Sequence, residues 1–71
     1  MQKLASSHVA GIDYDRNTRI LRVVFRNGTN YAYADVPSGV YEAFLRASSP
    51  GSFLHSRVRP HYRATKIGNG L

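Results

Sequence analysis

An Asn-Gly pair, Asn27-Gly28, constrains the fold of this 71-residue chain more than any other feature of its sequence. It separates two runs rich in β-branched and aromatic residues, RILRVVFR over 19–26 and TNYAYAD over 29–35. Asn-Gly between two such runs is a strong signal for the tight turn of a β-hairpin. A third run, HVAGIDYD over 8–15, alternates in character and is joined to the hairpin by DRNT, which has turn chemistry. The sequence therefore predicts three antiparallel strands in a meander.

Two registers of this hairpin are compatible with the turn, and they place Tyr31 and Tyr33 on different faces, because successive side chains of a strand alternate. A two-residue turn puts both tyrosines on the face of Arg22 and Arg26, which creates a basic aromatic platform suited to stacking nucleobases. A three-residue loop over 26–28, with its glycine left-handed beside a β-bulge, puts them with the apolar residues instead.

We favour the three-residue loop because it separates large apolar side chains from arginines, and a buried face strongly specifies register. The tyrosines then become core residues with hydrated hydroxyl groups rather than a stacking platform. Arg22 and Arg26 stay exposed on the back of the sheet. In this register the apolar face contains Leu21, Val23, Phe25, Tyr31 and Tyr33, and the opposite face contains Arg22, Val24, Arg26, Asn30, Ala32 and Ala34.

The apolar period changes after the strands, which indicates helices. Apolar residues recur at spacings of three and four over 37–48, so this segment is predicted to form an amphipathic helix with Pro37 in its first turn. A second helix is predicted to begin at Ser49-Pro50 and to stop near Arg59, since Pro60 disfavours helical geometry in the residue before it.

The predicted fold class is α+β, a three-stranded antiparallel meander followed by two short helices packed on one sheet face. The chain is too short for two domains, and residues 6–67 are expected to form one. Within it, residues 61–67 have the pattern of a short extended segment. We expect residues 1–5 to be a flexible N-terminus and residues 68–71 to be a frayed tail.

Positive charge is concentrated in the C-terminal third of the chain. The net charge is +6, and residues 46–71 contain no acidic residue. The segment RVRPHYR, over 57–63, interleaves arginines with aromatic rings, so it can offer guanidinium groups to phosphates and a ring to an exposed base. Nucleic acid is therefore the predicted partner, bound weakly and in a salt-sensitive way because few phosphates can be neutralised. The predicted nucleic-acid-binding residues are Arg46, Arg57, Arg59, Tyr62, Arg63 and Lys66.

The sequence leaves two alternatives to this function open. Tyr62 can pack beneath the second helix while the arginines only hydrate the surface. The module can instead bind a protein, through an unpaired strand edge or through the back of the sheet. The candidate residues for that protein interaction are Arg22, Val24 and Arg26.

No group of residues in the sequence points to catalysis, a metal or a cofactor. The chain has no cysteine, and His8, His55 and His61 lack the spacing of metal ligands. Asp13 and Asp15 precede a turn, so turn capping explains them more simply than acid–base chemistry. We therefore expect no enzymatic activity, no metal, no cofactor and no small-molecule substrate. Since no run suits a signal peptide or a membrane span, we also expect no membrane association and a cytoplasmic location.

Several segments in series resemble the KTSC domain family, which takes its name from a copy at the C-terminus of a lysyl-tRNA synthetase. They are SSHVAGIDYD, LRVVFRNGTNYAYADVP, VYEAFLRASSPGSFL and RVRPHY, and together they cover roughly residues 6–63. The chain departs from the family at Asp13, where the family tends to have glycine, and at Leu54 and His55, where it tends to have an aromatic residue and asparagine. The resemblance implies a compact α+β unit, and through the synthetase it favours RNA over DNA as the partner.

Overall fold

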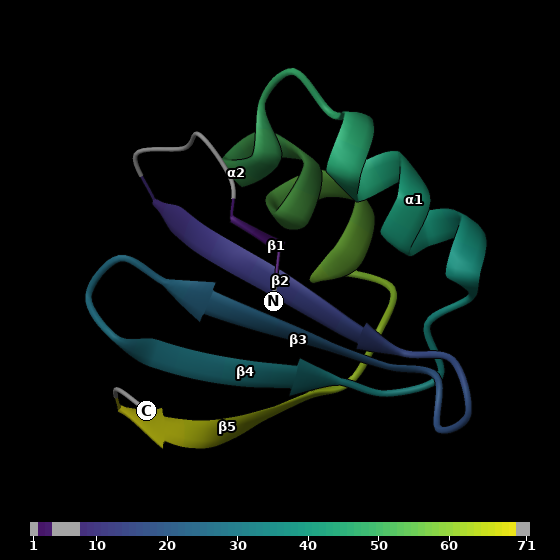
Figure 1. The fold of residues 1–71 in the computed structure, drawn as a ribbon, viewed down its shortest axis with the longest axis horizontal. Coiled ribbons are helices and arrows are strands. Elements are labelled where there is room, and N and C mark those ends of the chain that lie inside the picture. The colour runs from purple at the N-terminus through teal and green to yellow at the C-terminus, as the bar shows by residue number, and fades with distance from the viewer. Residues whose placement is uncertain (1, 4–7, 70–71) are drawn as a thin grey trace.

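The fold is built on a five-stranded antiparallel sheet whose strands follow one another in the order of the chain. The structure is a computed structural model, and it describes residues 2–3 and 8–69. Figure 1 shows the strands side by side, with the helices gathered on one side of them. The strands are β1 (Gln2–Lys3), β2 (Val9–Asp15), β3 (Ile20–Phe25), β4 (Thr29–Tyr33) and β5 (Ala64–Asn69).

The helices occupy the connection between β4 and β5 and confirm the change of period seen in the sequence. The first helix follows Pro37, and the second begins with Pro50 in its first turn and stops before Pro60, as predicted. Among the described residues, no helix is both long and apolar enough to cross a bilayer. The helical segments are α1 (Ser38–Arg46), α2 (Pro50–Phe53) and η1 (Leu54–Val58).

The second helix widens as it approaches its end. Segment α2 continues directly into η1, a π-helical segment in which the amide of Arg59 donates to the carbonyl of Leu54 at 2.9 Å. Ser49 stands at the N-cap position, but its hydroxyl contacts that of Ser52 at 3.1 Å and caps no backbone amide. Short π-helical segments are rare and often accompany functional sites, so the segment that carries the arginines has an unusual backbone.

The β3–β4 hairpin adopts the register of the three-residue loop. Val23 pairs with Tyr31 and Leu21 pairs with Tyr33. Gly28 has a φ of 91°, in the left-handed region, and its amide donates to the carbonyl of Phe25 at 2.9 Å. The prediction that both tyrosines share a face with the apolar residues of β3 is therefore confirmed.

The strand count is a correction, because the sheet has more than the three predicted strands. The segment expected to be a short extended piece forms β5, which pairs antiparallel with β4. Its composition, ATKIGN, is poor in the residues that favour strands. Backbone hydrogen bonds to the open edge of β4 hold it there, and such bonds leave little trace in the side-chain pattern.

The two ends of the chain also differ from expectation. Residues 68 and 69, predicted to fray, belong to β5 and pair with Asn30 and Thr29. Residues 2 and 3, predicted to be flexible, pair with β2 as β1. The remaining parts of those two predictions, residues 1, 4–5 and 70–71, lie outside the described residues.

The core lies between the sheet and the helices. Phe44 of α1 is fully buried, and its ring lies 5.1 Å from that of Phe53, centre to centre. Figure 1 shows the helices close to β2, with β5 the strand farthest from them, so the helices cover the sheet unevenly. The buried core residues are Val9, Ile12, Leu21, Val23, Tyr33, Val36, Phe44, Leu54 and Val58.

Candidate nucleic-acid interface

A cleft of about 460 Å³ opens where the β4–β5 part of the sheet meets the chain that follows η1. Its sheet side carries Tyr31 and Tyr33, on the face that also forms the core. Its other side carries Arg59 and Tyr62, which follow the second helix. The lining residues are Phe25, Asn27, Thr29, Tyr31, Tyr33, Arg59, Tyr62 and Ala64.

Aromatic rings form most of the apolar surface of this cleft. Phe25 and Tyr31 meet edge to face, with ring centres 5.7 Å apart and planes at 87°. Both rings are half-buried, whereas Tyr33 is only 3% exposed. Because aromatic rings are rigid and polarisable, such a wall suits a flat ligand that stacks.

Tyr33 has a raised pKa, so its hydroxyl keeps its proton at neutral pH. Burial of the phenol is the main cause, because desolvation disfavours the phenolate. The positive charge of Arg59 lowers this pKa in part, and Tyr31 raises it slightly. The influence of Arg59 on Tyr33 shows that a cation faces the phenol across the cleft.

Tyr62 is held against the end of the second helix by backbone hydrogen bonds. The amides of His61 and Tyr62 both donate to the carbonyl of Val58 at 3.1 Å, so the chain folds back tightly after η1. Pro60 lies inside this turn, where its fixed φ is compatible with the reversal. The tight turn leaves the Tyr62 ring half-buried and packed against the core.

The same ring borders three separate hollows, each with its own arginine. Arg59 lines the cleft described above. Arg63 lines a second hollow of about 500 Å³, and Arg57 lines a third of about 400 Å³. The structure thus brings the predicted residues of 57–63 together around Tyr62.

Lys66 joins this group through the sheet. It pairs with Tyr31 across β4 and β5, and directly opposed residues share a face, so it stands on the face that carries the cleft. We refer to the surface formed by Arg57, Arg59, Tyr62, Arg63 and Lys66 as the Tyr62 surface. Its four cationic side chains are exposed, and none forms an ion pair with another described residue.

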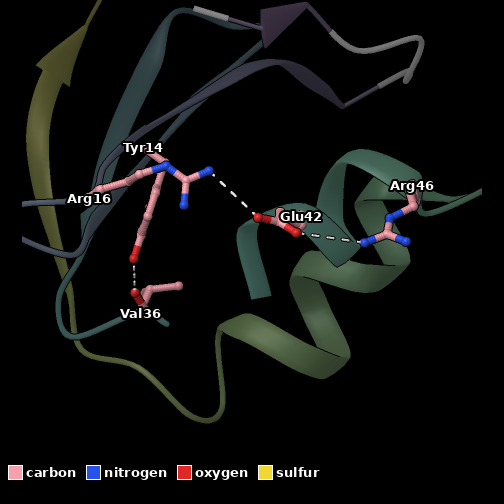
Figure 2. A network of polar contacts seen from close by, with 5 residues as sticks. All are labelled: Tyr14, Arg16, Val36, Glu42 and Arg46. Atoms are coloured by element: carbon pink, nitrogen blue, oxygen red, sulfur yellow. Dashed lines mark hydrogen bonds and ion pairs between the residues drawn. The ribbon is translucent and has the colours of Figure 1, made fainter. Parts of the chain in front are cut away.

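Arg46 does not belong to the Tyr62 surface. Its guanidinium lies 3.8 Å from Glu42, one turn earlier on α1, and Glu42 also lies 3.6 Å from Arg16 (Figure 2). Arg46 lines none of the three hollows around Tyr62. The structure therefore separates this residue from the other five predicted contacts.

The back of the sheet offers less than the sequence suggested. Val24 lies on the expected face but is only 9% exposed, so it presents little apolar surface. Arg22 is half-buried, and its Nε atom is buried with no hydrogen-bond partner among the described residues. Arg26 is exposed in the hairpin loop. The expected row of accessible residues is thus present only at Arg26.

Three aromatic residues of the cleft were assigned to the core from the sequence. Tyr33 is buried as expected, but Phe25 and Tyr31 also face the cleft. Their shared face was predictable from parity, whereas the part of that face left uncovered depends on where the helices pack. Asn27 was recognised only as a turn residue, although it lines the cleft as well.

Metal binding finds no support in the geometry of the described residues. Among residues 2–3 and 8–69, no three His, Cys, Asp or Glu side chains come together where they could hold a metal ion.

Comparison with known proteins gives one family. The KTSC domain matches residues 5–62 of the chain. A protein from Tsukamurella paurometabola is 36% identical over 67 residues, which cover 94% of this chain and 100% of that protein. The crystal structure of a KTSC domain protein from Yersinia pestis is 33% identical, covers 94% of each chain and has a TM-score of 0.90.

Proposed function

The chain belongs to the KTSC domain family, and we propose that it is a non-catalytic module that binds nucleic acid, RNA in preference to DNA, through the Tyr62 surface. The observation that carries this proposal is the juxtaposition of an aromatic cleft with cations that have no acidic partner among the described residues. Stacking on rings and neutralisation of phosphates are the two contributions by which proteins bind single strands.

The charge of the surface supports weak and salt-sensitive binding. Arg57, Arg59, Arg63 and Lys66 can neutralise about four phosphates. For a single strand this corresponds to a slope of about −3 in a plot of log affinity against log salt. Affinity should then fall roughly 50-fold between about 50 mM and about 200 mM salt.

The test is fluorescence anisotropy with labelled tRNA and with a labelled single-stranded RNA, at low and high salt. The variant Arg57→Glu/Arg59→Glu should lose saturable binding, because it reverses two cations beside Tyr62. The matched control is Arg16→Glu/Arg19→Glu, which changes the net charge equally but lies at the β2–β3 turn and lines none of the hollows around Tyr62.

The two variants separate local recognition from general attraction. Loss of binding only in the Arg57/Arg59 variant would support the Tyr62 surface. Equal losses in both variants would mean that RNA responds to net charge alone, and the proposal would be wrong. A single-stranded DNA of the same sequence completes the experiment, since tighter binding of DNA would overturn the preference for RNA.

A protein partner is the second candidate, and the side chain of Ile67 favours it. β5 is an edge strand of the sheet, and Ile67 is 53% exposed there. An open edge can accept a strand from another copy of the chain through backbone hydrogen bonds. Light scattering after size-exclusion chromatography should then show a dimer that Ile67→Lys dissociates, whereas a monomer at all concentrations would contradict this candidate.

A further inference from the structure

The polar groups that line the cleft are mostly hydrogen-bond donors. Arg59 can only donate, since a guanidinium carries no acceptor. Asn27 uses its side-chain oxygen to accept a hydrogen bond from the backbone amide of Thr29 at 2.9 Å. A backbone amide can only donate, so the accepting atom must be the oxygen, and the NH₂ group is what Asn27 keeps for a ligand.

Acceptors are scarce on the same walls. None of the described residues that line the cleft carries a carboxylate. The hydroxyls of Tyr31 and Tyr33 can donate or accept. The raised pKa of Tyr33 keeps its hydroxyl protonated, so it retains the ability to donate across the neutral range. A ligand that carries acceptors on its edge therefore matches these walls best.

The four nucleobases differ in this respect. Uracil presents two carbonyl oxygens, and guanine presents a carbonyl oxygen beside a ring nitrogen that accepts. Adenine and cytosine carry an amino group in the corresponding position, which would point a donor at donors. The volume of the cleft, about 460 Å³, lies within the range of about 300–1,000 Å³ that is usual for small-ligand sites.

We infer that the cleft accepts a single unstacked keto base, uracil or guanine, from a single-stranded RNA and disfavours adenine and cytosine. The inference rests on the proposed function and adds base selection to it. The base lies against the rings of Tyr31 and Tyr62, with its carbonyl edge toward Arg59 and Asn27. The neighbouring arginines and Lys66 hold the phosphates on either side.

Oligo(U) and oligo(C) RNAs of equal length provide the direct comparison. Their phosphates are equal in number and both bases are small pyrimidines, so the charge contribution cancels and the keto or amino group remains as the main difference. Anisotropy should show oligo(U) bound about tenfold more tightly than oligo(C), the size expected from one good set of base-edge hydrogen bonds.

Asn27→Asp is the variant that isolates the donor. An aspartate keeps an oxygen for the amide of Thr29 and suits a turn followed by glycine, but it replaces the NH₂ donor with an acceptor. The preference for oligo(U) should fall to near unity or reverse. Asn17→Asp is the matched control, since it adds the same charge in the β2–β3 turn, and it should lower both affinities slightly while leaving their ratio unchanged.

The outcomes distinguish the inference from the proposed function. RNA binding that depends on Arg57 and Arg59, with equal affinities for the two oligonucleotides or a ratio unaffected by Asn27→Asp, overturns the inference alone. The free nucleotides UMP and CMP, followed by amide NMR shifts at residues of the cleft, cover the remaining case. If no RNA binds but UMP shifts Asn27 and Tyr31 more than CMP does, base selection holds and RNA binding is wrong. If neither RNA nor nucleotide binds, both are wrong.

Discussion

The hydroxyl of Tyr14 donates a hydrogen bond to the backbone carbonyl of Val36, and this bond ties β2 to the start of α1 (Figure 2). The amide of the same Val36 donates to the carbonyl of Arg19 at 2.9 Å. Both backbone polar groups of a fully buried residue are thereby satisfied by the β2–β3 region. The ring of Tyr14 stacks on Tyr41 with centres 5.0 Å apart, which adds a second link to α1.

Tyr14→Phe should lower the free energy of unfolding by about 1 kcal/mol, because it leaves the carbonyl of Val36 without its donor. The stack on Tyr41 is retained, so urea denaturation measures the hydrogen bond alone. Tyr41→Phe is the matched control, because the Tyr41 hydroxyl has no partner among the described residues. Equal effects of the two substitutions would contradict a specific role for the Tyr14 hydroxyl.

Phe44→Ala should destabilise the domain by about 3–5 kcal/mol, since the side chain is fully buried against Phe53 and its removal leaves a cavity. A domain of this size has a core that rarely supplies more than about 3–5 kcal/mol of net stability. Circular dichroism should therefore show a largely unfolded protein at room temperature. Phe44→Leu should remain folded, and a cooperative native-like transition in the alanine variant would refute the assignment of Phe44 to the core.

Gly28→Ala should cost about 1–2 kcal/mol, because φ at this position is 91° and a side chain there is strained. Thermal denaturation gives the size of the effect. Gly39→Ala serves as a comparison, since it lies in α1 and a Cβ at that position meets no atom within 4 Å. That substitution should be neutral or stabilising, and a larger loss at Gly39 than at Gly28 would be inconsistent with the observed loop.

Tyr33 should titrate above the ordinary tyrosine pKa of about 10. Above that value the unfolded chain loses the Tyr33 proton while the folded protein retains it, so the free energy of unfolding falls as the pH rises toward the folded-state pKa. Phenolate absorbance, with Tyr33→Phe subtracted, follows this single group. Arg59→Gln should raise the pKa further by removing the cation that lowers it, and an unchanged titration would show that Arg59 does not face the phenol.

Tyr62→Ala should weaken RNA binding by about 1–3 kcal/mol, the usual contribution of one stacked base. Tyr62→Phe keeps the ring and should bind nearly as well as the original chain. The pair also controls for stability, because Tyr62 packs partly against the core and its removal carries a folding cost. Both affinities are measured at a temperature where circular dichroism shows each variant folded, and equal binding by the alanine variant would exclude stacking on this ring.

The elements predicted correctly are those determined by local pattern. Asn27-Gly28, together with the alternation of apolar residues in β3, was enough to predict the register that places Tyr31 opposite Val23. Spacing of apolar residues was enough to predict both helices, and Pro50 and Pro60 indicated the limits of the second. These signals act over a few residues, so the sequence carries them directly.

The elements that were missed depend on long-range packing. β5 forms because β4 offers an open edge, and its own residues have little strand preference. The cleft exists because the helices leave the Tyr31 part of the sheet uncovered, which no local pattern encodes. Arg46 was grouped with the other cations by sequence position, whereas the helix places it beside Glu42. For the same reason Val24 was expected at the surface and is nearly buried.

A ring that forms a wall of three hollows makes their volumes interdependent. Rotation of the Tyr62 side chain toward any one of them reduces that space and enlarges another, because the backbone behind it is held by the carbonyl of Val58. Two molecules that occupy different hollows then compete without touching each other or sharing a polar contact. Such competition is negative coupling between sites, and it acts equally in both directions.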